Sequence, residues 1–389
     1  MKLVYLLMGA ILTPWIAFSQ GMVFQKGTWE ETKALAKAEN KLIFFDANTS
    51  WCGPCKWMEK NTFTDEKVGD FYNNNFLAFK QDMEKGVGVE LAKEFKIRGY
   101  PTLLFLNGDG EIVHRTMGAI DADKFLALGK IAIDPQRNLA GMENRYRNGE
   151  RTKPFIREYL AVLADAGKPT KEILDWYFYN MPDEELLTQE NFEVIKRHLY
   201  DLNAPQFKFL VENREAYSKI VPEKEVKDKI YNVYRSNLFS ALYSNDSARW
   251  EQAKADVKAS VIDKPDELLA YANTYYYSRK KDWSSYIEAV NNYATNYLND
   301  NWQSLNSYAW QVYTNKQITD KSSLKQALKW IDRSIELNSC YANNDTKAAL
   351  LYKLGNKKGA LKFAKKAISL AGPDDNVSGT EELIAKITG

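Results

Sequence analysis

The sequence has few of the residues that build metal sites or disulfide frameworks. Its 389 residues include only three cysteines, Cys52, Cys55 and Cys340, and two histidines, His114 and His198. A disulfide-scaffolded protein carries more cysteines in a shorter chain. A structural zinc site needs about four ligands, and the histidines and Cys340 lie far along the chain from the close pair. We therefore expect no metal, and one reactive cysteine pair plus a bystander.

The chain also lacks net charge of one sign and long apolar segments. Its 53 basic and 51 acidic residues leave a formal charge of +2, which gives no reason to expect nucleic acid or an anionic membrane as a partner. Beyond the N-terminus, no segment has the ~18 or more continuous apolar residues that a membrane-spanning helix needs. The composition is that of a globular protein, and at about 100–200 residues per domain the length predicts two or three domains.

Residues 1–19 are predicted to be an export signal. Lys2 provides a basic start, residues 3–12 are apolar, and small residues precede a cleavage point after Ser19. The alternative is an uncleaved membrane anchor, but the apolar run is short and is broken at Pro14. We expect a mature protein that is soluble in the periplasm or another extracytoplasmic space.

Residues 20–135 alternate between strand and helix patterns, which predicts a central sheet with helices on both faces. A capping box at Thr28 and Glu31 begins the first helix, and Asp121 can cap the last one. The predicted strands are residues 41–47, 76–80, 102–106 and 111–117; the predicted helices are residues 29–38, 54 onward, 89–95 and 122–131.

The chemistry is predicted at Cys52 and Cys55, where a strand pattern gives way to a helix. Two cysteines at this spacing can close a disulfide across the first helical turn. There the backbone N–H groups and the helix dipole stabilise a thiolate. Lowering a thiol pKa from about 8.5 to about 7 takes roughly 2 kcal/mol. Cys52 is the expected nucleophile, and Cys55, one turn in and expected to be more buried, is the resolving thiol. Pro54 suits the first turn because it has no N–H.

The stretch from Trp51 to Cys55 (WCGPC) resembles the active-site motif of thioredoxins. The resemblance covers residues 22–132 and implies a cis proline at Pro101, which would free backbone groups to pair with an extended substrate; the alternative is an ordinary turn with a trans bond. It also implies a buried carboxylate at Asp46, which could take the proton of Cys55 or could only end a strand. The substrate-binding residues that it implies are Trp51, Gly53, Pro54, Gly99, Tyr100, Pro101 and Gly118.

Residues 55–70 are most similar to a sub-group of this family. They resemble the C-terminal thioredoxin-like domain of the transmembrane thiol-disulfide interchange reductases. That resemblance implies that Glu59, seven positions after Cys52, assists proton transfer; the alternative is a solvated helix residue. A pairing of Lys80 with Asp46 across the sheet remains open, because the sequence does not settle the register.

From residue 136 onward the pattern is helical. Residues 136–265 form a helical region, and residues 266–389 resemble tetratricopeptide repeats. Ala327 and Ala360 occupy corresponding positions 33 residues apart, close to the ~34-residue period of that family. Small residues at Gly355, Ala364 and Ala367 would let two helices approach. Stacked helix pairs of this kind commonly present a groove to protein segments.

Two further features of the repeats have ordinary interpretations. The copy that contains Trp310 carries an insertion at residues 316–323. Cys340 is expected to be a small buried residue between repeats. The lysines of residues 353–366 are expected to form a solvated helix face. The fold class is therefore an α/β thioredoxin fold followed by an all-α, tetratricopeptide-like region.

The function predicted first is that of an exported enzyme that reduces protein disulfides. Gly53-Pro54 between the cysteines resembles reducing thioredoxins; oxidases and isomerases often place a histidine there. We expect no cofactor beyond the redox-active Cys52–Cys55 disulfide, a membrane thiol-disulfide reductase as electron donor, and a possible client on the helical repeats. Two alternatives are a disulfide isomerase or oxidase for exported proteins, and a protein-binding scaffold that uses the repeats.

Overall fold

The structure, a computed structural model, describes residues 21–179 and 181–389. The chain divides into two compact units, one ending at Leu186 and one running from Leu187 to Gly389. The export signal predicted at residues 1–19 lies outside the described residues.

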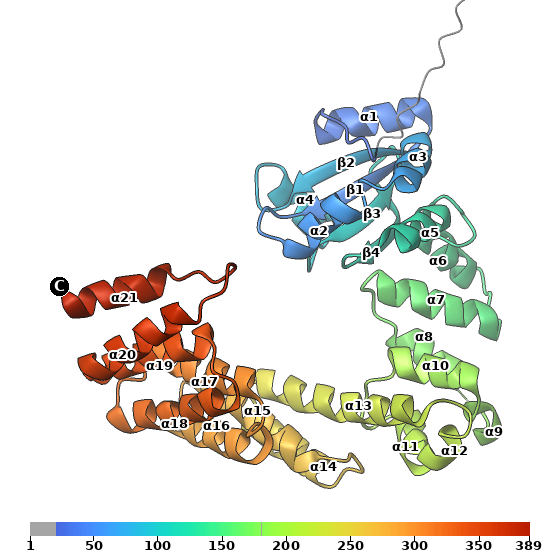
Figure 1. Ribbon diagram of the computed structural model, residues 1–389. Coiled ribbons are helices and arrows are strands. Elements are labelled where there is room, and N and C mark those ends of the chain that lie inside the picture. Colours follow the sequence, from blue (N-terminus) through green and yellow to red (C-terminus); the bar gives the residue numbers. More distant parts are fainter. Residues whose placement is uncertain (1–20, 180) are drawn as a thin grey trace, which may run out of the picture. The chain divides into compact units, whose positions relative to one another are not determined.

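In the described part of the first unit, four strands form one sheet in the order β2–β1–β3–β4 (Figure 1). The central strand β1 runs parallel to β2 and antiparallel to β3, and β3 pairs antiparallel with β4. The strands are β1 (Leu42–Asn48), β2 (Phe76–Asp82), β3 (Thr102–Leu106) and β4 (Ile112–Met117).

Two separate cores form because neighbouring side chains of β1 point to opposite faces of the sheet. Phe45 packs with residues of α1 and α4, whereas Phe44 packs with residues of α2, α3 and α5. The prediction of helices on both faces is confirmed. The helices are α1 (Trp29–Glu39), α2 (Gly53–Asn61), α3 (Glu66–Asn75), α4 (Gly88–Glu94) and α5 (Ala122–Ala132).

The two predicted helix caps are present. The Thr28 hydroxyl accepts a hydrogen bond from the Glu31 N–H at 3.2 Å, and the Glu31 carboxylate accepts one from the Thr28 N–H at 2.7 Å. The Asp121 carboxylate accepts a hydrogen bond from the Lys124 N–H at 2.9 Å. Each cap satisfies N–H groups that have no partner within the helix.

Four further helices belong to the first unit, and two of them cover β4. Both α6 and α7 contact this edge strand. The buried His114 of β4 accepts a hydrogen bond at Nδ1 from the Leu139 N–H of α6, at 3.1 Å. Burial lowers the pKa of His114 to about 4, so the ring is neutral at pH 7. The helices are α6 (Leu139–Arg147), α7 (Lys153–Asp165), α8 (Lys171–Phe178) and α9 (Asp183–Leu186).

The second unit is helical throughout its described residues, as the sequence predicted. Its helices are α10 (Gln189–His198), α11 (Pro205–Glu212), α12 (Arg214–Tyr217), α13 (Glu223–Tyr243), α14 (Ser247–Lys258), α15 (Pro265–Lys280), α16 (Trp283–Tyr297), α17 (Trp302–Thr314), α18 (Lys321–Leu337), α19 (Tyr341–Lys353), α20 (Lys357–Ser369) and α21 (Ser378–Thr388).

From α13 to α20 these helices pack as successive pairs (Figure 1). Three of the connections turn at a residue with positive φ: Asn245, Lys281 and Gly355. The connection from α17 to α18 is longer, at residues 315–320, where the sequence predicted an insertion. Small side chains on α20 at residues 360, 364 and 367 are fully buried, which lets α19 and α20 approach closely. The assignment of these pairs to the tetratricopeptide family stays a prediction.

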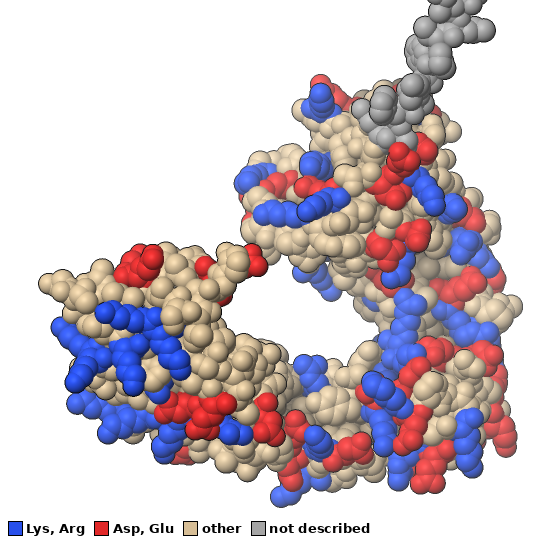
Figure 2. All heavy atoms as spheres, viewed as in Figure 1, with Lys and Arg blue, Asp and Glu red and all other residues tan. Residues whose placement is uncertain are grey.

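Two expectations for the C-terminal helices are wrong. Cys340 is partly exposed, because it precedes α19 as its N-cap and does not lie inside a helix interface. Lys353 belongs to no solvated face: its ammonium donates to the carbonyls of Val312, Tyr313 and Asn315 at 3.4, 2.8 and 3.1 Å. It thereby supplies a donor to two carbonyls in the last turn of α17 and to the carbonyl of the C-cap residue Asn315. The lysines of α20 itself are exposed, and Figure 2 shows basic side chains gathered over this helix.

Candidate active site

Cys52 and Cys55 form a disulfide at the N-terminus of α2. Their Cα atoms are 5.3 Å apart, and Cys52 is the N-cap residue of the helix. The Cys52 Sγ atom accepts a hydrogen bond from the Cys55 N–H at 3.1 Å. Pro54 occupies the first turn, where no N–H is needed. The sulfur of Cys52 therefore lies where the N–H groups of a helix end favour negative charge.

The expected difference in burial between the two cysteines is wrong. In this disulfide form Cys52 is 2% exposed and Cys55 is 4% exposed. The disulfide draws the Cys52 sulfur over the first helical turn, so its side chain is covered as well as that of Cys55. Both sulfur-bearing side chains are therefore covered to a similar extent in the disulfide form.

The Pro101 segment lies beside the end of β1 that leads to the cysteines. Ala47 near the end of β1 pairs with Thr102, so Pro101 is next to the strand that continues to Cys52. The Tyr100–Pro101 peptide bond is cis, as the resemblance implies. The Pro101 carbonyl accepts a hydrogen bond from the Gly118 N–H at 2.9 Å.

Three glycines leave open space around this site. A Cβ atom built on Gly53, Gly99 or Gly118 would meet no other atom within 4 Å. Gly118 also has a φ of +94°, a conformation that residues with a Cβ rarely adopt. The three positions assigned to substrate binding therefore have room for another chain, although their role in binding stays a prediction.

Trp51 forms an exposed rim of the site. Its side chain is 64% exposed, and its ring centre lies 6.0 Å from that of Tyr100 in an edge-to-face arrangement. The indole Nε1 donates a hydrogen bond to the Glu84 carboxylate at 2.8 Å. Glu84 could not be predicted from the sequence, because the contact joins residues 33 positions apart through the tertiary fold.

Asp46 is a buried carboxyl group on β1, the strand that leads to the cysteines. It is 1% exposed, and burial raises its pKa to about 7. A hydrogen bond donated by the Asn48 side chain at 3.0 Å opposes this rise. Glu59 raises the pKa further and Lys80 lowers it. A group with a pKa near neutrality can both take and release a proton at physiological pH.

The possible pairing of Lys80 with Asp46 is corrected by the structure. The two residues are partners in the register of β1 and β2, but the Lys80 ammonium binds the Glu59 carboxylate at 2.8 Å. Both members of this ion pair are half-exposed, so the ammonium keeps contact with water. Pairing with Asp46 would instead bury the charge, which costs more free energy.

The comparisons with known proteins agree with this geometry. A family model described as a thioredoxin-like domain matches residues 29–132. Thioredoxin H2-2 of Oryza sativa subsp. japonica is 36% identical over 98 residues, which are 25% of this chain and 68% of that protein. The chain belongs to the thioredoxin-like family.

Other relatives carry the same type of domain within different proteins. The thiol:disulfide interchange protein DsbD of Yersinia pestis is 35% identical over 95 residues, which are 24% of this chain and only 16% of DsbD. A solution structure from Bacteroides thetaiotaomicron, described as a proposed disulphide isomerase, is 44% identical and covers 30% of this chain and 95% of that one, with a TM-score of 0.28. With its close cysteine pair, the thioredoxin-like domain is a thiol-disulfide oxidoreductase domain.

Other kinds of site are absent from the described part of the chain. Within residues 21–179 and 181–389, no three His, Cys, Asp or Glu side chains gather in a way that could hold a metal ion. No helix in the described ranges is long and apolar enough to cross a bilayer.

Proposed function

We propose that this chain is an exported enzyme that reduces disulfides in other proteins through Cys52 and Cys55. The proposal is carried by the disulfide at the N-terminus of α2, which follows β1, the strand that bears the buried Asp46. Gly53-Pro54 between the cysteines supports the reducing direction, since no histidine is present there to stabilise the thiolate further.

The proposed reaction begins with the dithiol form. The Cys52 thiolate attacks one sulfur of a substrate disulfide, forms a mixed disulfide and releases the other substrate sulfur as a thiolate. Asp46 takes the proton of Cys55, and the Cys55 thiolate then attacks the Cys52 sulfur. The second substrate thiolate leaves, and the Cys52–Cys55 disulfide forms. Two electrons have moved to the substrate, and a proton from Asp46 can return to a leaving thiolate.

The enzyme also needs an electron donor, a compartment and a client. The dithiol must be restored by an electron donor, for which we propose a membrane thiol-disulfide reductase. Export and a periplasmic location are supported by the pattern of residues 1–19. The helix pairs of the second unit, which we propose are tetratricopeptide-like, would hold the client protein.

Two assays test this proposal: the reduction of insulin, which measures disulfide reduction, and the refolding of scrambled ribonuclease, which measures disulfide isomerisation. We expect the wild type to reduce insulin, Cys52→Ser to abolish the reaction, and Cys340→Ser, the same change at the third cysteine, to leave it intact. A reduction potential near about −270 mV would fit a reductase, whereas one near about −120 mV would assign an oxidase. Faster ribonuclease rescue than insulin reduction would favour the isomerase alternative.

Client proteins can be identified by trapping them as mixed disulfides. A Cys55→Ser variant cannot resolve the mixed disulfide, so it should accumulate client proteins bound to Cys52 in the native host. A cellular role that persists in Cys52→Ser would instead support the scaffold alternative.

A further inference from the structure

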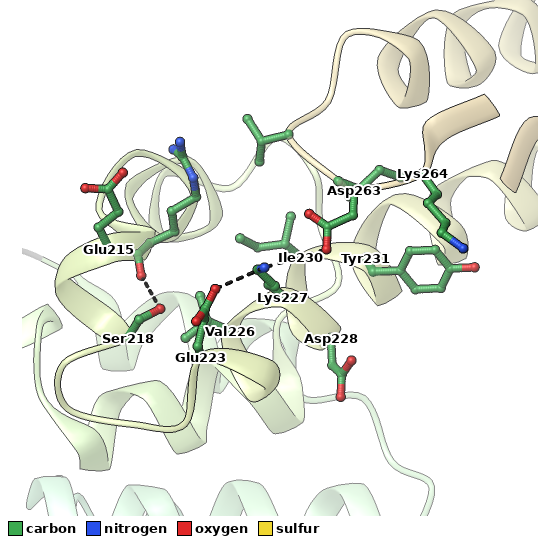
Figure 3. A pocket seen from close by; sticks show the side chains of 13 residues that line it. Glu215, Ser218, Glu223, Val226, Lys227, Asp228, Ile230, Tyr231, Asp263 and Lys264 are labelled. Atoms are coloured by element: carbon green, nitrogen blue, oxygen red, sulfur yellow. Dashed lines mark hydrogen bonds and ion pairs between the residues drawn. The ribbon is translucent and has the colours of Figure 1, made fainter. Parts of the chain in front are cut away.

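The pocket beside the start of α13 shows how charges that are paired with one another leave a ligand unselected. It has a volume of about 750 Å³ and is lined by side chains of both signs (Figure 3). Lys227 lies 3.0 Å from Glu223 and 3.7 Å from Asp263. Because these charges are neutralised within the wall, the pocket favours a ligand of neither sign. A carboxylate beside the cysteines, that of Glu84, has no such partner.

Glu84 follows β2 and is held at the end of the sheet where the cysteines lie. The Met83 N–H donates to the Asn48 carbonyl at 2.9 Å, which continues the pairing of β2 with the cysteine end of β1. The Glu84 carboxylate accepts a hydrogen bond at Oε2 from the Trp51 indole at 2.8 Å. Trp51 directly precedes Cys52 in the chain, so Glu84 is fixed against the neighbour of the proposed nucleophile.

The Glu84 side chain is exposed and has no cationic partner among the described residues. The neighbouring Asp82 differs, because it forms an ion pair with Lys85 at 3.1 Å. Lys56 and Arg98, the cations nearest in sequence to the cysteines and to the cis proline, are also exposed, and neither forms an ion pair with Glu84 in the described chain. The Oε1 atom of Glu84 is therefore available to a cation from another molecule.

Two aromatic rings lie between this carboxylate and the segment that we assign to substrate binding. The exposed Trp51 indole meets the Tyr100 ring at 6.0 Å between centres. Burial raises the pKa of the Tyr100 hydroxyl, and the nearby carboxylates of Glu84 and Asp82 raise it further. Tyr100 forms the cis bond to Pro101. A substrate strand that pairs with this segment therefore carries its side chains past both rings and toward Glu84.

We propose that Glu84 selects substrate polypeptides that carry a lysine or arginine beside the cysteine under attack. This inference rests on the proposed function and names a class of substrate for the same site. The cationic end of the substrate side chain binds Glu84 Oε1 and lies against the Trp51 indole, whose face attracts cations. A hydrogen bond from an ammonium or guanidinium to a carboxylate is stronger than a neutral one. An acidic residue in the same place meets a like charge and is disfavoured.

The test measures single-turnover exchange with the full chain, reduced beforehand with dithiothreitol and then freed of it. The substrates are the symmetrical disulfides of acetyl-Lys-Cys-Lys-amide and acetyl-Glu-Cys-Glu-amide, which place charge on both sides of the cysteine. Exchange is stopped with N-ethylmaleimide, and mass spectrometry counts the free thiols that remain on the protein.

The ratio of the two rates is divided by the ratio measured with dithiothreitol, because flanking charges also change the intrinsic reactivity of a disulfide. We expect this corrected ratio to favour the lysine peptide at least about threefold, and to fall toward one in about 1 M salt. Because both peptides meet the wild-type chain, the comparison does not depend on a variant that folds.

Two variants assign the effect to Glu84. Glu84→Gln keeps an acceptor for the Trp51 indole but removes the charge, so it should bring the corrected ratio close to one. Glu111→Gln is the matched control, since its carboxylate accepts a hydrogen bond from the Asn107 amide at 2.9 Å that glutamine can also accept. Glu111 lies at the hairpin end of β3, roughly 13 Å along the strand from Thr102. This exceeds the Debye length of about 8 Å at physiological salt, so the ratio should stay at its wild-type value.

The outcomes separate this inference from the proposed function. A wild-type ratio near one, equal ratios in the wild type and Glu84→Gln, or no reaction of the lysine peptide would overturn the role of Glu84 while insulin reduction stands. A protein that reacts with neither peptide and leaves insulin intact would overturn the proposed function together with this inference.

Discussion

At the scale of single residues, Asp46 is a carboxyl group that the fold removes almost completely from water. The residue is 1% exposed, and burial disfavours the charged form, so its pKa is about 7. In the unfolded chain an aspartate has a pKa of about 3.9. Between these two values the folded protein binds a proton that the unfolded chain has released. The contribution of Asp46 to stability therefore falls as the pH rises from about 4 to about 7.

Replacing Asp46 with asparagine should remove this pH dependence. We expect Asp46→Asn to stabilise the oxidised protein at pH 8 by on the order of 3 kcal/mol and to change its stability little at pH 4. Urea unfolding of both proteins across this pH range gives the measurement. If Asp46→Asn raised the free energy of unfolding equally at pH 4 and pH 8, burial would not be what raises the pKa of the Asp46 carboxyl.

The two members of the Glu59–Lys80 ion pair should shift the pKa of Asp46 in opposite directions. Glu59→Gln removes a neighbouring negative charge and should lower the pKa of Asp46, whereas Lys80→Met should raise it. ¹³C NMR of the Asp46 carboxyl measures both shifts directly. Because the pair is half-exposed, each change should alter the free energy of unfolding by less than about 1 kcal/mol. Shifts of the same sign would contradict the arrangement seen here.

At the scale of elements, the hydrogen bond from Leu139 to His114 fastens α6 to β4. The buried imidazole has a pKa of about 4, below the unfolded value of about 6.5. Between pH 6.5 and pH 4 the unfolded chain binds a proton that the folded chain excludes, so this contribution to stability is lost as the pH falls. The sign is opposite to that of Asp46 in the same window.

His114→Asn should separate the two effects. The amide oxygen can accept the bond from the Leu139 N–H, but the side chain does not titrate. The smaller side chain should cost stability at every pH. The difference from the wild type should therefore shrink by on the order of 2–3 kcal/mol as the pH falls from 7 to 4. Denaturant unfolding checks this, and a constant difference across that range would contradict a buried neutral imidazole.

The end of α17 depends on a side chain from α19. Lys353 donates to three carbonyls there, so Lys353→Met should leave them without this partner. We expect a loss of about 1–3 kcal/mol in the free energy of unfolding. Lys362→Met on the exposed face of α20 is the matched control, and it should stay within about 0.5 kcal/mol of the wild type. Equal effects of the two substitutions would show that the cap contributes nothing.

At the scale of the whole molecule, the chain forms two compact units, and the cysteine site belongs to the first. Each unit has its own buried core, so we expect the cysteine site to be insensitive to mutations in the second unit. Lys353→Met should leave insulin reduction within about twofold of the wild type. A larger loss, measured on the full-length protein under conditions where it is folded, would reveal communication between the units.

Much of the fold could be predicted because its signals are local. The capping box at Thr28 and Glu31 spans one helical turn, and the two-residue alternation of Phe44 and Phe45 follows from strand geometry. The position of the disulfide follows from the spacing of two cysteines at a helix start. The partner of Lys80 was not predictable, because its register with Asp46 and the approach of Glu59 both depend on packing between elements.

By itself, the sequence determined which residues carry the chemistry and which elements present them, since motif spacing and periodicity act over a few residues. The tertiary structure alone decided how those residues are tuned. It buried Asp46, joined Trp51 to Glu84, and brought Lys353 to the carbonyls at the end of α17. The physical reason is that burial and desolvation depend on segments far apart in the chain, and no local pattern specifies which segments will meet.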